Sequence, residues 1–87
     1  MTPRLFVANL CADVARCIKA MEDNDSERYE SSLLRARKTL SYLRAVNRPE
    51  AYEEGLLLLR GLELARKDGL QEFARSVDRY ASELVAA

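Results

Sequence analysis

The chain has 87 residues, of which 48% are hydrophobic and 32% are charged. This composition is typical of a compact globular chain, and the length fits a single domain, 1–87. Fourteen basic residues balance fourteen acidic ones, so nothing attracts the whole chain to nucleic acid or anionic lipid. Because the sequence has no histidine, it lacks the commonest general base and the commonest nitrogen ligand of metals.

The first predicted helix covers 3–22. Thr2 followed by Pro3 is typical of an N-cap and a first helical position. Apolar residues then recur at spacings of three and four, which indicates a helix: Val7, Leu10, Val14, Cys17, Ile18 and Met21. A polar turn follows, in which Asn24 and Glu27 have the spacing of a capping box.

The two cysteines of this helix are predicted to be buried thiols. Cys11 and Cys17 are six residues apart, about 240° around a helix, so they cannot form a disulfide within it. The apolar run that precedes Asp13 is interrupted by Asn9, unlike a secretory leader. No run approaches the roughly 18 apolar residues of a membrane span. We therefore expect a reducing, cytoplasmic setting and no membrane partner.

The second predicted helix covers 26–46, and its apolar residues follow heptad spacing: Tyr29, Leu33, Ala36, Leu40 and Leu43. At the next break Asn47 and Glu50 again have capping-box spacing, which starts a third helix over 49–68. Gly69 suits the left-handed position that ends a helix.

A fourth helix is predicted over 70–86, with one apolar stripe: Leu70, Phe73, Val77, Tyr80 and Leu84. The second half of the chain repeats the apolar pattern of the first at an offset of 44 residues, so that Val14 and Ile18 correspond to Leu58 and Leu62. Short loops make neighbouring helices antiparallel. The predicted fold is therefore all-α, an antiparallel four-helix up-down bundle built from two helical hairpins.

No pattern of residues indicates catalysis. The glycine-rich phosphate loops and the GxSxG nucleophile motif are absent, and a di-iron bundle would need Glu-x-x-His pairs. Glu50, Glu53 and Glu54 are explained by the positive end of the third helix dipole. We therefore expect no enzyme activity, no metal and no cofactor.

Positive charge is concentrated in the second helix. Residues 26–48 carry a net charge of +4. Their basic residues flank the apolar seam: Arg28, Arg35, Arg37, Lys38, Arg44 and Arg48. We expect these flanks to face acidic residues of the third and fourth helices. Nucleic-acid binding by this helix is the least favoured hypothesis, because no group of aromatic residues on which bases could stack accompanies its basic residues.

The third helix carries more leucine than a bundle helix needs. Six leucines between 56 and 64 cover nearly its whole circumference, so it must be covered on more than one side. Either this helix is central in an irregular bundle, or its second face, with Leu57 and Leu64, meets another chain, most simply a symmetric partner. The residues nominated for partner contact are Leu34, Lys38, Tyr42, Leu57, Arg60 and Leu64.

The acidic turn at 20–25, followed by Leu33, Ala36, Leu40 and Leu43, resembles flagellin export chaperones and, more broadly, small helical secretion chaperones. The resemblance covers about residues 10–84. It implies a helical protein that binds another polypeptide without catalysis, as an adaptor or a chaperone. A second resemblance, to tetratricopeptide hairpins, rests on Gly61, Leu64, Gly69 and Ala74. The alternative function is a purely structural homodimer that buries the same leucines.

Overall fold

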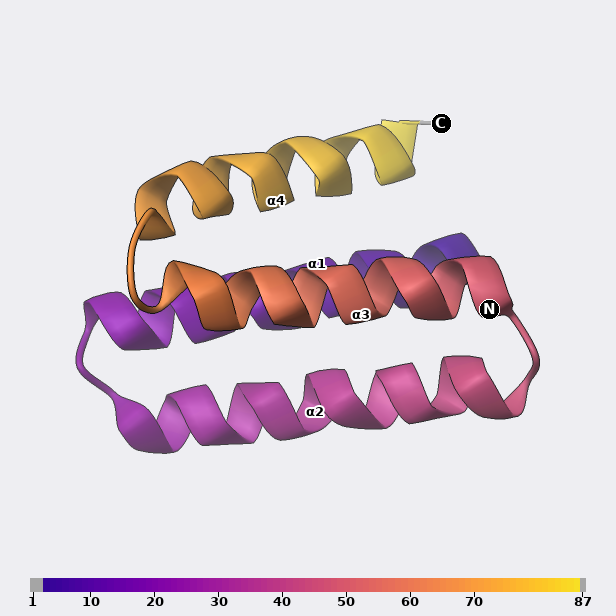
Figure 1. Cartoon of the computed structure of the whole chain (residues 1–87), viewed down its shortest axis with the longest axis horizontal. Coiled ribbons are helices and arrows are strands. Elements are labelled where there is room, and N and C mark those ends of the chain that lie inside the picture. Colours follow the sequence, from indigo (N-terminus) through magenta and orange to yellow (C-terminus); the bar gives the residue numbers. More distant parts are fainter. Residues whose placement is uncertain (1–2, 87) are drawn as a thin grey trace.

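The structure is a computed structural model that describes residues 3–86. Within these residues it contains four α-helices and no strand, which confirms the all-helical prediction (Figure 1). The helices are α1 (Pro3–Glu22), α2 (Ser26–Ala45), α3 (Pro49–Ala65) and α4 (Leu70–Ala86). Thr2, the predicted N-cap of α1, lies outside the described residues. In the described part of the chain, no helix combines the length and the apolar character needed to cross a membrane.

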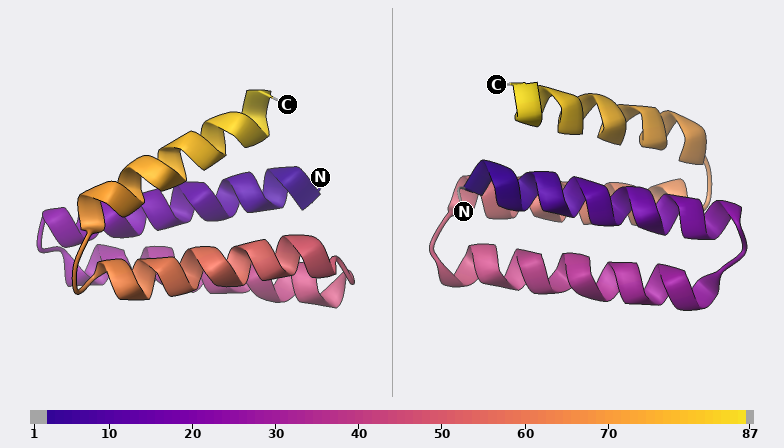
Figure 2. Two further views of the ribbon diagram at one scale, coloured as in Figure 1. Left: turned by 45° about the horizontal axis from the view of Figure 1, so that its top comes forward. Right: turned by 180° about the vertical axis from the view of Figure 1, so that it is seen from behind.

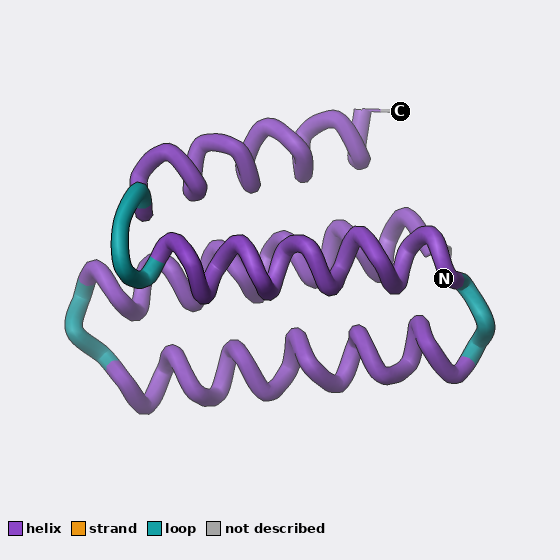
Figure 3. The backbone as a smooth tube through the Cα atoms, viewed as in Figure 1, coloured by secondary structure: helices purple, strands orange, loops and turns teal. Residues whose placement is uncertain are grey.

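The three turns between the helices are short (Figure 3). Asp25, not Asn24, caps α2, because its carboxylate accepts a hydrogen bond of 3.0 Å from the backbone N–H of Arg28. Asn24 has a φ of 55°, and Asn47 before α3 has a φ of 57°. Asparagine tolerates this left-handed conformation better than most residues do. Both asparagines therefore form turns, and the predicted caps at these two positions are wrong; Arg48 occupies the N-cap of α3 without a side-chain bond.

α3 ends at Ala65, three residues earlier than predicted. Its last turn tightens, because the backbone N–H of Lys67 bonds to the carbonyl of Leu64, three residues back, at 3.2 Å. Gly69 has the predicted left-handed conformation, with a φ of 78°. Its carbonyl accepts the first hydrogen bond of α4, from Phe73 N–H at 3.0 Å. Gly69 therefore starts α4 rather than ending α3.

α1 is the most buried helix of the fold. It packs against the other three helices, and α3 lies beside it, with α2 and α4 on either side (Figures 1 and 2). Within residues 3–86, α2 and α4 do not contact each other. The buried residues of α1 include every predicted one except Met21, which is partly buried. α3 also contacts all three other helices, so the prediction that it is central holds in part. Central packing accounts for the buried Leu58 and Leu62 but not for the exposed leucines of α3, which need another explanation.

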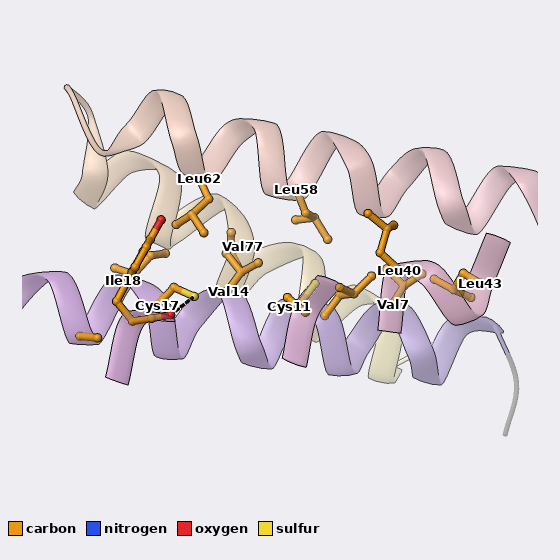
Figure 4. Close-up of a cluster of buried hydrophobic side chains, with 14 residues drawn as sticks. Val7, Cys11, Val14, Cys17, Ile18, Leu40, Leu43, Leu58, Leu62 and Val77 are labelled. Atoms are coloured by element: carbon orange, nitrogen blue, oxygen red, sulfur yellow. Dashed lines mark hydrogen bonds between the residues drawn. The ribbon is translucent and has the colours of Figure 1, made fainter. Parts of the chain in front are cut away.

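The heptad seam of α2 forms its side of the core, as predicted (Figure 4). Tyr29, Ala36, Leu40 and Leu43 are buried, and Leu33 is partly buried. The cysteines of α1 are also buried, as predicted, and both are free thiols. The core therefore follows from the sequence spacing in the first hairpin.

α4 is packed more loosely than its counterpart α2. Within residues 70–86 only Val77 is buried, whereas Phe73 and Tyr80 are half-buried. The helix packs mainly on α1 and leans away from α3 toward its C-terminal end (Figure 2). The similarity of the two halves in sequence therefore does not extend to equal packing, and one flank of α3 stays open.

Candidate polypeptide-binding surface

Three leucines of α3 are exposed. Leu57 is 69% exposed, Leu64 is 65% exposed and Leu56 is 42% exposed, whereas Leu58 and Leu62 face the core. The leucines of α3 therefore divide between a buried side and an open side. Apolar side chains gathered on an open helix face are typical of interaction surfaces in soluble proteins.

A groove runs between α2 and α3, with a volume of about 580 Å³. Its apolar lining comes from both helices: Leu33 and Leu40 from α2, and Leu56, Leu59, Leu62 and Leu64 from α3. Three arginines and one acid also line it: Arg37, Arg60, Arg66 and Glu63. We call this feature the α2–α3 groove. It combines an apolar floor with a rim of positive charge.

The arginines of the groove are not neutralised by the chain itself. None of the three forms an ion pair within residues 3–86. The guanidinium of Arg66 lies over the ring of Tyr29, 4.7 Å from its centroid, a cation–π contact that leaves its charge in place. Burial raises the pKa of Tyr29, so this phenol is neutral near pH 7 and adds no negative charge.

Other arginines of α2 do have acidic partners, but not the predicted ones. Arg28 pairs with Asp23 at 3.1 Å, and Arg35 pairs with the buried Asp13 of α1 at 3.5 Å. The expectation that the basic flanks face acids of the third and fourth helices is therefore wrong for these two. The reason is that α2 packs most closely on α1, whose acids and following turn lie beside it.

A shallow hollow lies on the other side of α3, against α4. It is lined by Glu54, Leu57, Leu58, Phe73 and Tyr80. The Tyr80 hydroxyl donates a hydrogen bond to the Glu54 carboxylate, which joins the two helices. Gly61 allows the ring of Phe73 to approach, since a Cβ atom there would lie 2.6 Å from Phe73 Cε1. We call this feature the α3–α4 hollow.

The structure does not bring the six nominated residues into one patch. Arg60 and Leu64 line the α2–α3 groove, and Leu57 lines the α3–α4 hollow. On α2, the ring of Tyr42 packs against Phe6 of α1, with the centroids 4.7 Å apart. Two further nominees, Leu34 and Lys38, are exposed but line neither feature.

Sequence reasoning missed several residues of the groove. Arg37 and Arg66 rim it, and Leu33, Leu56 and Leu59 supply apolar lining. One signal was available: Leu33 and Arg37 are four residues apart, and so are Leu56 and Arg60, so each helix carries a leucine and an arginine on one side. Which sides face each other depends on packing that the spacing alone does not fix.

Within residues 3–86 there is no cluster of three or more metal-ligating side chains. No family model, no curated protein and no solved structure matches the chain.

Proposed function

We propose that the chain is an up-down antiparallel bundle of two helical hairpins that binds a helix of another polypeptide, without catalysis, in the α2–α3 groove. The observation that carries the proposal is the groove itself: leucines of two helices along its floor, with three unpaired arginines at its rim. A groove between two helices is a common receptor for the apolar face of a third.

The charges of the groove favour an acidic amphipathic helix as the ligand. Arg37, Arg60 and Arg66 stand against Glu63 alone, so the rim carries a net positive charge. A ligand helix with leucines on one face would bury them in the groove. Glutamates beside those leucines would lie against the arginines of the rim, and the opposite charges would neutralise each other. A ligand with lysines in the same positions would place like charges together.

An adaptor or a secretion-chaperone-like protein, the class predicted from the sequence, would use such a groove to hold a segment of its client. The same proposal includes a reducing, cytoplasmic setting, in which both thiols stay free. Of the basic residues of α2, Arg37 lines the groove and would bind a peptide rather than nucleic acid, while Arg28 and Arg35 are already paired with aspartates.

The test is a titration with two synthetic peptides of about five helical turns. Both carry leucines at helical spacing; one has glutamates on the flanks and the other has lysines. We expect the glutamate peptide to bind at least about tenfold more tightly, because only its charges complement the rim. Amide chemical shifts should change along residues 33–40 of α2 and along residues 56–66, which include most of the second half of α3 and its C-cap.

Two charge reversals on neighbouring residues provide the control. Arg37→Glu should weaken binding of the glutamate peptide by about tenfold or more, because it reverses one rim charge. Lys38→Glu makes the same change in charge at an exposed residue outside the groove and should have little effect. Equal binding of the two peptides, or equal effects of the two variants, would contradict the proposed function.

A further inference from the structure

The open side of α3 carries a second heptad stripe, separate from its core stripe. Glu53, Leu57, Arg60, Leu64 and Lys67 follow spacings of four, three, four and three, and all five are exposed. Heptad spacing keeps the first four, which lie within α3, on one side of the helix, and Lys67 follows in the turn after it. We call this set the outward stripe of α3; it runs from an acid at its start to a base in the turn that follows the helix.

The outward stripe is complementary to itself when it is reversed. If a second α3 lies antiparallel at the level of Arg60, Leu57 meets the partner subunit's Leu64, and Leu64 meets the partner subunit's Leu57. Glu53 then faces the partner subunit's Lys67, and the reciprocal pair forms at the other end. A twofold axis repeats each contact, so one stripe supplies two leucine pairs and two ion pairs.

The α3–α4 hollow fits this arrangement. It opens beside Leu57, and its walls include Phe73 and Tyr80, whose rings are only half-buried in one copy. In the reversed alignment, the residue that arrives at the level of Leu57 is the partner subunit's Leu64. An exposed leucine would therefore meet an open apolar hollow.

We propose that two copies of the chain associate through α3, antiparallel about a twofold axis at Arg60, with the Leu64 of each copy seated beside Leu57 at the α3–α4 hollow of the other. This inference goes beyond the proposed groove function, because Leu57 and the hollow lie outside the groove, while Arg60 and Leu64 belong to both surfaces. The occupant is a second copy because the stripe complements its own reversed sequence in both apolar and charged positions.

The axis itself has one unfavourable feature, which provides a test. Each Arg60 meets the partner subunit's Arg60, so two like charges approach each other. Arg60→Leu should therefore tighten the dimer by about tenfold, measured by sedimentation equilibrium over a range of protein concentrations. If the variant dimer were unchanged or weaker, the proposed twofold axis at Arg60 would be wrong.

The adjacent leucines Leu56 and Leu57 are matched variants for the main experiment. Leu57→Glu should shift the chain from dimer to monomer at concentrations where the wild type is dimeric, with its helical content retained. Leu56 lines the groove and not the hollow, so Leu56→Glu should keep the dimer and lose the glutamate peptide. The Leu56 and Leu57 variants therefore separate peptide binding from dimerisation, whereas Arg60 and Leu64 belong to both surfaces.

Charge exchange tests the register. Glu53→Lys alone and Lys67→Glu alone should each weaken the dimer several-fold, and the double variant should restore it. The two positions are 14 residues apart, about 20 Å along a helix, so a rescue cannot arise within one copy. A wild-type chain that sediments as a monomer at about 0.5 mM, or a double variant with no rescue, would overturn the proposal.

Discussion

Replacing Leu40 with alanine should lower the free energy of unfolding by about 2–5 kcal/mol. Leu40 is 8% exposed and belongs to the core cluster in which α2 meets α1 and α3 (Figure 4). Truncation removes buried methyl groups and leaves a cavity. Since small domains have about 5–15 kcal/mol in total, the loss is a large share of the stability. Urea unfolding followed by far-ultraviolet dichroism measures it.

The matched control is Leu34→Ala, at a leucine on the same helix that is 55% exposed. We expect this variant to unfold within about 0.5 kcal/mol of the wild type. If the Leu40 and Leu34 variants had equal stability, the seam of α2 would not be the core and the assigned face of the helix would be wrong.

A partner mutation tests the contact more closely. A Cβ atom at Gly55 of α3 would lie 2.6 Å from Leu40 Cδ1 and 2.9 Å from Leu10 Cδ1. Gly55→Ala alone therefore sets a helix-propensity gain of about 1 kcal/mol against a clash. Once Leu40 is alanine, the nearer clash is gone and the new methyl group enters the cavity. Gly55→Ala should therefore stabilise the Leu40→Ala background, with a coupling of about 1–2 kcal/mol.

The helices and the core were predictable because both follow from local spacing. Apolar residues at intervals of three and four mark the buried face of a helix wherever its partners lie, so Leu10, Val14 and Leu43 were assigned correctly. The caps were less predictable. Asn24 and Asp25 are adjacent and both can cap, and the choice between them depends on the path of the turn.

The binding surface was predictable only in part, because it depends on how the helices are arranged. The excess of leucine in α3 indicated an open face, and Leu57 and Leu64 are indeed exposed. However, Tyr42, also nominated for partner contact, packs one side of its ring on Phe6 of α1 and lines neither the groove nor the hollow, since α2 lies closest to α1. The hollow exists because α4 leans away from α3, and no local pattern in the sequence encodes that angle (Figure 2).

High pH should destabilise the fold through its two buried thiols. Burial raises the pKa of Cys11 and of Cys17 from 9.0 to about 11, and the nearby carboxylates Glu54 and Asp13 act in the same direction. The Cys17 thiol also lies 3.8 Å from the carbonyl of Tyr29, to which only the protonated form can donate (Figure 4). The folded state therefore holds both protons more tightly than the unfolded state does.

The sign of the pH effect follows from this difference. The contribution of each thiol to stability is complete below about pH 9 and is lost as the pH rises toward 11, at a cost of about 2 kcal/mol per thiol. The free energy of unfolding should therefore fall steeply over that interval in urea titrations. The pKa of Tyr29 and that of Tyr80 are also raised, chiefly by burial, so part of the slope belongs to these phenols.

The double variant Cys11→Ala with Cys17→Ala separates the two sources. It should be less stable than the wild type near pH 7, because two small buried side chains are truncated. Between pH 9 and 11, however, its stability should fall less steeply, because no thiol remains to ionise and only Tyr29 and Tyr80 contribute. Parallel curves for the two proteins over this interval would show that the thiols ionise equally readily in the folded and unfolded states, contrary to their burial in the core.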